Sequence, residues 1–357
     1  MNLYKMIQIN GIRLSRDMIQ VRQDYPPGEP RDFQPICRRL SQNRINMTCV
    51  GAHLTPSLTR FACCLDKNHL NAAGIDAQGV KGFRDNEAQL PPARGREVVL
   101  PEMCVISIYP HHSNPRILAS LLEIFSRTDI LFRHMVSSNS MLSFVIEIRF
   151  QDQIISLLKE GFLLPDSHTP FRQDLDEDIS HLLKKYPETR ATYVEEKIKT
   201  YGFSICPGLD LFHLSLTPEN LSGYSEALKS LDTPDAKFCF FSALGPAEDF
   251  ASDQDRFYDF ALMTSPLGES AKRSFKEQTS QFNSRESFGP GQGDLISFHG
   301  PHFGDRYRIL DTAISCMDQA GLPILYIGCT GASISMVLPP GLGQEGKAAL
   351  EMGFETP

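Results

Sequence analysis

The stretch GDRYRILDTAISCMDQAGLPILYIGCTGASISMVLP, residues 304–339, decides how this chain is read. It opens with a short polar turn. An amphipathic helix follows, because its apolar residues recur at helical spacing, and Gly321 ends that helix. Two apolar runs on either side of residues 328–331 then indicate two strands. The predicted apolar face of the helix consists of Leu310, Ala313, Ile314 and Met317.

The same unit recurs, without gaps, at two earlier places in the chain. Leu310 corresponds to Leu118, 192 positions earlier, and to Phe33, a further 85 positions earlier. An amphipathic helix alone is common, but three matches with the same step into the next strand indicate an internal repeat. The alternative is three unrelated β–α–β pieces of one α/β domain. The matching helix faces are Leu121, Leu122 and Phe125 after Leu118, and Ile36, Cys37 and Leu40 after Phe33.

Composition limits the class of protein. At 357 residues the chain has room for two to four domains, and 41% hydrophobic residues suffice for packed cores. The net charge is −8 with scattered Lys and Arg, so nothing favours nucleic acid or a membrane as partner. No apolar run approaches the ~20 residues of a membrane span. The nine cysteines form no CxxC pair, and the start lacks a signal peptide's apolar core, which predicts buried, reduced thiols and a cytoplasmic protein.

The fold class follows from the order of the predicted elements. Residues 99–165 alternate as β-α-β-β-α-β, which is the ferredoxin-like split βαβ arrangement. We therefore expect an α+β protein of tandem ferredoxin-like units, each with its own antiparallel sheet and helices on one face. The units and connections are expected at 1–98 (first unit), 99–165 (second unit), 166–264 (a degraded third unit or an irregular α/β region), 265–293 (a polar linker) and 294–357 (last unit).

Two of these ranges carry more specific expectations. In the third, the charged tract 176–199 is expected to be helical with Val194 and Ile198 on the inner face, and Leu221 lies on a second helix. The last unit ends in a helix with almost nothing after it, so its final strand is expected from elsewhere in the chain or from another chain. An open apolar edge would otherwise promote aggregation.

The repeated unit resembles the ACT domain, a ligand-sensing domain that often occurs in tandem. The closest likeness is to the regulatory tail of aspartate kinases, where an ISFVV-like strand precedes a helix of the EKAVRALHEAF kind. Here ISMVL at 334–338 precedes a helix at 346–354. The sequence has no KFGGTS-like opening of a kinase domain. No motif for a cofactor is found either. The resemblance therefore implies a non-catalytic regulatory or sensor protein without a cofactor, linked to amino-acid metabolism.

The resemblance also implies where a ligand binds. In the family, a turn close to D-R-P-G precedes the first helix, and its glycine lets an amino acid approach the helix N-terminus at a domain interface. Free N–H groups and the positive end of the helix dipole attract a carboxylate there. This sequence has arginine at the glycine position in all three copies, namely Arg31, Arg116 and Arg308.

The arginines leave three interpretations open: solvated side chains on the first turn, a filled pocket in a scaffold, or extra donors for a different anion. The last unit keeps Gly304, Asp305 and Arg306 in the turn before Arg308, and this turn is the strongest candidate. The predicted ligand-binding residues are Gly304, Asp305, Arg306, Arg308, Cys329 and Thr330, with Asn114 and Arg116 in the second unit.

Other candidate chemistry is weaker. His111 with His112, and His299 with His302, fall on equivalent turns, but no acidic or cysteine partner sits at metal-ligand spacing, so no metal site is predicted. The expected partners are an amino-acid effector and either a second copy of the chain or a separate enzyme. A structural or adaptor protein with filled pockets is the main alternative, and an enzyme whose site lies in residues 170–265 is the third.

Overall fold

The computed structural model describes most of the chain, and the described residues fall into four segments. Segment 1 covers the described residues between 7 and 69, segment 2 covers 96–165, segment 3 those between 197 and 282, and segment 4 those between 291 and 356. The described residues are 7–25, 33–55, 58–69, 96–165, 197–233, 236–246, 257–282, 291–301, 303–304, 306–331 and 333–356.

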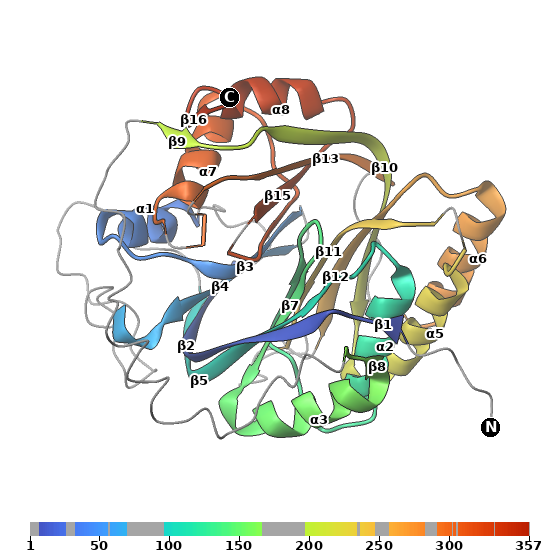
Figure 1. Ribbon diagram of the computed structural model, residues 1–357. Coiled ribbons are helices and arrows are strands. Elements are labelled where there is room, and N and C mark those ends of the chain that lie inside the picture. Colours follow the sequence, from blue (N-terminus) through green and yellow to red (C-terminus); the bar gives the residue numbers. More distant parts are fainter. Residues whose placement is uncertain are drawn as a thin grey trace.

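Each segment contains a long strand, a helix and two further strands in that order (Figure 1). In segment 1 these are β2 (Gly11–Tyr25), α1 (Gln34–Gln42), β3 (Thr48–Thr55) and β4 (Leu58–Asp66); in segment 2 they are β5 (Arg96–Tyr109), α2 (Pro115–Ser126), β6 (His134–Ser137) and β7 (Leu142–Glu147). In segment 3 they are β10 (Phe203–Leu216), α5 (Leu221–Ser230), β11 (Phe238–Leu244) and β12 (Tyr258–Thr264); in segment 4 they are β13 (Gln292–His299), α7 (Ile309–Gln319), β14 (Tyr326–Cys329) and β15 (Ser333–Leu338).

Segments 2 to 4 each continue with a second helix. Two short parallel sheets, β1 with β8 and β9 with β16, lie beside the main strands. Single turns of 3-10 helix complete the described elements. The additional elements are α3 (Gln151–Gly161), α6 (Glu269–Ser280), α8 (Gly343–Leu350), β1 (Ile7–Gln8), β8 (Phe162–Leu163), β9 (Ile198–Lys199), β16 (Phe354–Glu355), η1 (Lys67–His69), η2 (Ile148–Phe150) and η3 (Pro218–Asn220).

The twelve strands of the four segments, β2–β7 and β10–β15 without the short β1, β8, β9 and β16, form one closed, antiparallel barrel, in the order β10-β12-β11-β6-β7-β5-β2-β4-β3-β14-β15-β13. A mixed α/β protein with antiparallel sheets is therefore confirmed, but the expectation of a separate sheet for each unit is wrong. The physical reason is that a three-stranded piece has two unpaired edges, and pairing edge to edge removes all of them. Segments 2 and 3 join through β6 and β11, and segments 1 and 4 join through β3 and β14.

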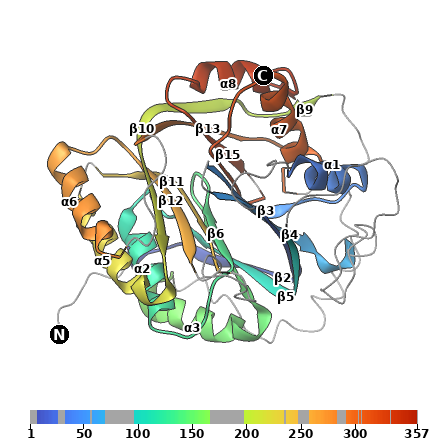
Figure 2. The ribbon, with the colours of Figure 1, turned by 180° about the vertical axis from the view of Figure 1, so that it is seen from behind.

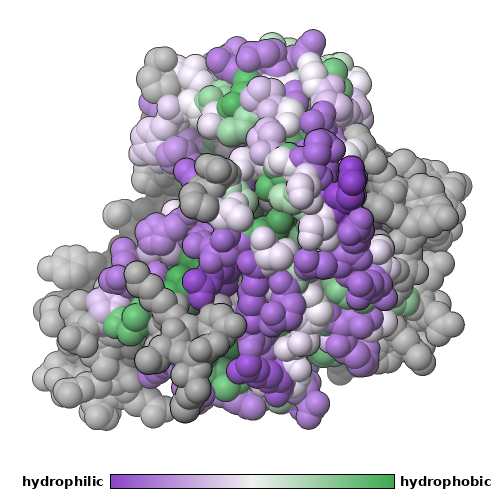
Figure 3. All heavy atoms as spheres, turned by 90° about the vertical axis from the view of Figure 1, so that its right-hand side faces the viewer, coloured by the Kyte–Doolittle hydropathy of each residue, from purple (hydrophilic) through white to green (hydrophobic). Residues whose placement is uncertain are grey.

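The barrel is flattened, so that its twelve strands form two six-stranded sheets that pack face to face. We call the half built from segments 2 and 3 the 2–3 sheet, and the half built from segments 1 and 4 the 1–4 sheet. Helices α2, α3, α5 and α6 cover the outer face of the first, and α1, α7 and α8 that of the second (Figures 1 and 2). On the face that carries α5 and α6, hydrophilic residues predominate and apolar ones form only small areas (Figure 3).

The predicted helix faces are buried in the two outer cores. Leu118 and Phe125 pack under α2, and Leu310 and Met317 pack under α7, all at most 4% exposed. Local sequence also sets where α2 begins, because Asn114 caps it and Pro115 fits the first helical position. Leu118 and Leu310 therefore occupy equivalent helices, as the repeat predicted.

Two expectations about the second half of the chain need correction. Residues 265–293 are not a linker, since α6 lies there with Phe275 buried in the core of segments 2 and 3. Ile198 belongs to strand β9 rather than to a helix. The predicted helix that contains Leu221 is confirmed as α5. Val194 lies outside the described residues. Residues 265–293 have a polar composition like that of a linker, because α6 covers the sheet with few apolar residues.

The last strand also differs from the expectation. Segment 4 has its own final strand, β16, although it is only two residues long. It pairs with β9, which precedes segment 3, and not with the barrel. The pairing partner thus comes from elsewhere in the chain, while the strand itself does not.

Polar side chains occupy the middle of the interface between the two sheets, and we call them the polar layer. They connect one sheet to the other: Arg60 of β4 forms an ion pair with Asp259 of β12, whose other carboxylate oxygen accepts the Ser215 hydroxyl hydrogen. Arg60 is 3% exposed and Asp259 is fully buried. Further contacts between the sheets are Gln20 Nε2 with His134 Nδ1 at 2.5 Å, His53 Nε2 with Ser242 Oγ at 3.0 Å, Tyr326 Oη with His213 Nδ1 at 3.2 Å, and Arg22 Nη1 donating to the Gly245 carbonyl at 2.6 Å.

Candidate functional site

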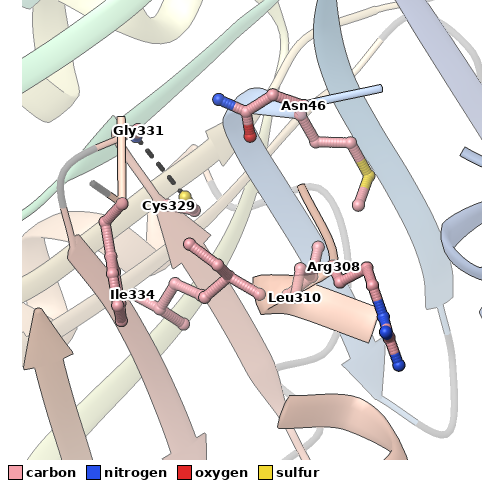
Figure 4. A pocket seen from close by; sticks show the side chains of 9 residues that line it. Asn46, Arg308, Leu310, Cys329, Gly331 and Ile334 are labelled. Carbon is pink, nitrogen blue, oxygen red and sulfur yellow. Dashed lines mark hydrogen bonds between the residues drawn. The ribbon is translucent and has the colours of Figure 1, made fainter. Parts of the chain in front are cut away.

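A small pocket lies at the N-terminus of α7, between segments 4 and 1 (Figure 4). One wall comes from α7 and the ends of β14 and β15, and the other comes from the residues that lead into β3. The two walls are distant in sequence and meet because β3 pairs with β14. The lining residues are Asn46, Met47, Phe303, Arg308, Ile309, Leu310, Cys329, Gly331 and Ile334.

The start of α7 supplies the polar end of this pocket. Arg308 precedes the helix in a left-handed conformation, with φ of 73°, and no side chain caps the helix. The first helical hydrogen bond runs from the Thr312 N–H to the Arg308 carbonyl. The N–H groups of the first turn, from Ile309 onward, therefore have no partner inside the helix and favour an anion. The exposed Arg308 side chain points away from Cys329 and Gly331 (Figure 4).

The rest of the pocket is apolar and tight. Met47, Phe303, Leu310 and Ile334 are at most 7% exposed and enclose it. The cavity volume is about 10 Å³. This is room for about one water molecule, so a larger ligand would need the walls to move apart. No carboxylate is among the lining residues, which suits an anionic ligand with an apolar body.

Two polar contacts shape the mouth and the floor. The Asn46 side-chain N–H donates to the Gly304 carbonyl at 2.6 Å and ties segment 1 to segment 4. The Cys329 sulfur accepts the Gly331 N–H at 3.4 Å. Burial raises the pKa of the Cys329 thiol to about 11, against a lowering by this hydrogen bond, so the thiol is protonated and unreactive at neutral pH. The Thr330 hydroxyl is buried without a hydrogen-bond partner.

The sequence located part of this site. Arg308 and Cys329 line the pocket, Gly304 and Thr330 are adjacent to lining residues in the chain, and Arg306 is two positions before Arg308. Asp305 lies outside the described residues. The residues that sequence reasoning missed are Asn46, Met47, Phe303 and Ile334; no local signal marks the first two, because strand pairing alone brings them to α7.

Asn114 and Arg116 do not join that pocket but lie at its counterpart in segment 2, which we call the α2 turn. The Asn114 side chain accepts the Arg116 N–H at 2.8 Å, so the start of α2 is capped by its own residue. Arg116 Nε lies 3.5 Å from an Asp232 carboxylate oxygen, with both side chains partly exposed. Helix α2 also begins earlier in the repeat than α7, since Arg116 is helical and Arg308 is not.

The space at the α2 turn is filled. The His111 ring, at the repeat position of Phe303, packs on the Phe238 ring with centroids 4.6 Å apart. Both side chains are at most 2% exposed. Phe238 leads the strand β11 as Met47 leads β3, so the two walls correspond. The α7 pocket and the α2 turn are thus equivalent places, of which the first holds a small cavity and the second is occupied by the His111 ring.

The described part of the chain offers neither a metal centre nor a membrane span. Among its residues no group of three or more His, Cys, Asp or Glu could hold a metal ion. His299 packs near Tyr201 instead, with ring centroids 5.3 Å apart, and His302 is not among the described residues. No described helix has both the length and the apolar character needed to cross a bilayer.

Comparison with known proteins defines the class of fold. No protein-family model matches the sequence, and no curated protein matches it either. Among solved structures, an aspartate kinase from Synechocystis superposes with a TM-score of 0.71 at 13% identity, covering 97% of this chain and 56% of that chain. The fold is therefore shared with that kinase, and this chain spans about half of its length.

Further neighbours carry related names but fit less well. The ligand-free regulatory subunit of aspartate kinase from Thermus thermophilus has a TM-score of 0.36 at 16% identity, covering 43% of this chain and 99% of that one. Aspartokinase III from E. coli, in complex with lysine and aspartate, has a TM-score of 0.31 at 12% identity, covering 45% and 35%. The shared fold rests on the Synechocystis aspartate kinase, a member of the class of proteins that the resemblance in the sequence named.

Proposed function

We propose that this chain is a regulatory module of four ACT-type units, corresponding to segments 1 to 4, that binds a small carboxylate-bearing metabolite such as an amino acid. The site is the pocket between α7 and the residues that lead into β3. One observation carries the proposal: an uncapped helix start faces a pocket whose two walls come from different segments. The fold shared with the Synechocystis kinase supports a role linked to amino-acid metabolism.

The pocket chemistry supports binding rather than catalysis. Its ionisable lining groups are an arginine that points outward and a cysteine thiol whose pKa is raised by burial. Neither provides a general base or a nucleophile at neutral pH. A ligand would bridge the two walls and shift the chain toward the packing for which it has higher affinity. The readout would be a change in how the module contacts a second copy or a separate enzyme.

The test is a thermal-shift screen of the full chain against the twenty amino acids. We expect one compound, or a small group with apolar side chains, to raise the melting temperature in a saturable way. Replacing Asn46 with Asp places a negative charge at the mouth, so Asn46→Asp should weaken the response at least tenfold. The matched control is Asn139→Asp, an exposed position in the turn between β6 and β7, which should leave the response unchanged.

A scaffold with filled pockets is the second candidate, and two observations favour it. The cavity holds only about one water, and its counterpart at the α2 turn is already filled. Under this reading, none of the twenty compounds shifts the melting temperature, and Asn46→Asp behaves like Asn139→Asp. That result would rule out amino-acid sensing at this pocket and leave association with a partner enzyme as the role.

A further inference from the structure

We propose that the α2 turn is a second small-molecule site that the protein occupies with its own imidazole, the side chain of His111. The inference goes beyond the proposed function and does not depend on what the α7 pocket binds. In the intact protein the ring occupies the counterpart of the α7 pocket. Without the ring, the site would take a small, neutral, planar molecule with one donor and one acceptor.

The His111 ring makes two hydrogen bonds to backbone groups, and a small bound molecule with one donor and one acceptor could make the same two. Its Nδ1 accepts the Ser113 N–H at 2.9 Å, so in the neutral ring the proton resides on Nε2, which donates to the Ser138 carbonyl at 2.6 Å. Both partners are backbone groups, and both belong to the turns that surround the space in front of α2. The ring thus satisfies one partly buried donor and one partly buried acceptor of the backbone.

The residues that surround the His111 ring come from two segments, as do the walls of the α7 pocket. Phe238 of β11 covers one face of the imidazole, and its backbone N–H donates to the Ser113 carbonyl at 2.9 Å. This hydrogen bond joins Phe238 of segment 3 to the turn before α2 in segment 2. Burial lowers the pKa of His111, which agrees with a neutral ring that uses one nitrogen as donor and the other as acceptor.

The repeat explains why this place is a site at all. His111 and Phe238 occupy the positions that Phe303 and Met47 hold at the α7 pocket. Phe303 cannot make the two hydrogen bonds, and Met47 is narrower and more flexible than phenylalanine. The same arrangement of turn, helix and neighbouring strand thus leaves a cavity at α7, whereas the His111 and Phe238 rings occupy the corresponding space at α2. The difference lies in these two side chains and in the cap that Asn114 provides.

The test removes the ring and supplies it from solution. In His111→Gly we expect a lower melting temperature than in the unchanged protein, and a saturable rise when imidazole is added at pH 8. At ten times its Kd, imidazole should recover roughly 2 °C. The unchanged protein and His112→Gly, an adjacent exposed position, should show no saturable rise. If His111→Gly does not fold, His111→Ala replaces it with the same expectations.

A second probe tests the hydrogen bonds rather than the shape. 1-Methylimidazole has no N–H to donate to the Ser138 carbonyl, so its rescue of His111→Gly should be at least fivefold weaker than that of imidazole. Equal rescue by both compounds would overturn the assignment of the donor. Absence of any imidazole response in the variants, or the same response in the unchanged protein, would overturn the proposal itself.

Discussion

The two outer cores and the polar layer between the sheets solve the same packing problem in opposite ways. Under the helices, the sheet faces are covered by aliphatic and aromatic side chains such as Leu118 and Phe144. Between the sheets, Arg60, Asp259 and His134 are nearly or fully buried. The outer cores gain stability from apolar burial without directional constraints. The polar layer instead fixes one relative placement of the two sheets, because each of its groups must meet a partner on the other side.

The largest expected effect comes from breaking the central ion pair. Asp259→Ala removes one ion-pair partner of the buried Arg60 side chain, which keeps its ion pair with Asp24 at 3.4 Å, and should cost about 3 kcal/mol in the free energy of unfolding. Urea denaturation at pH 7.5 measures it. A well-packed apolar replacement of the pair, Arg60→Met with Asp259→Leu, should cost less than Asp259→Ala alone. A larger loss in the double variant would show that the layer gives stability and not only specificity.

The next effect tests how closely the sheets approach. Gly328 of β14 faces the other sheet, and a Cβ there would lie 2.8 Å from Val136 Cγ2 and 2.9 Å from Phe240 Cε2. We therefore expect Gly328→Ala to destabilise the chain by about 1–3 kcal/mol through overpacking. The matched control is Gly291→Ala, where a Cβ meets nothing within 4 Å. Equal denaturation midpoints for the two variants would contradict the close packing of the sheets.

The last expected effect is the dependence of stability on pH, which differs between the polar layer and the outer cores. Burial lowers the pKa of His134 to about 4, against a raising hydrogen bond to the Cys49 carbonyl. The folded pKa is below the unfolded value near 6.5, so the unfolded state binds the proton first. Stability is kept above pH 6.5 and falls toward pH 4, by at most about 1.4 kcal/mol per pH unit for this group.

The measurement is urea denaturation in steps between pH 7 and pH 4.5, with His134→Gln as the comparison. The variant lacks this titration, so its stability should fall less steeply with decreasing pH. Parallel curves would mean that His134 does not control the acid sensitivity of the polar layer. An outer-core variant such as Leu118→Ala should keep the slope of the unchanged protein, since it removes no titratable group.

The sequence predicted the parts of the fold that depend on local pattern. Leu118, Leu310 and their neighbours recur at helical spacing, and both helices bury those faces. It failed where a helix is nearly polar, as in α6, because the period of apolar residues is then too weak to detect. It also placed Asn114 and Arg116 at a ligand site, whereas Asn114 caps its own helix and Arg116 lies near Asp232.

The amino-acid sequence by itself determined the helices with a strong apolar period, their inner faces, and the polar turn before α7 that makes it a candidate anion site, because these follow from spacing and side-chain type within a few residues. Only the tertiary structure decided that the strands close into one barrel, that Met47 completes one pocket, and that Phe238 fills the other. The reason is physical. Unpaired strand edges find partners over distances of hundreds of residues, and no local pattern records which edge each will choose.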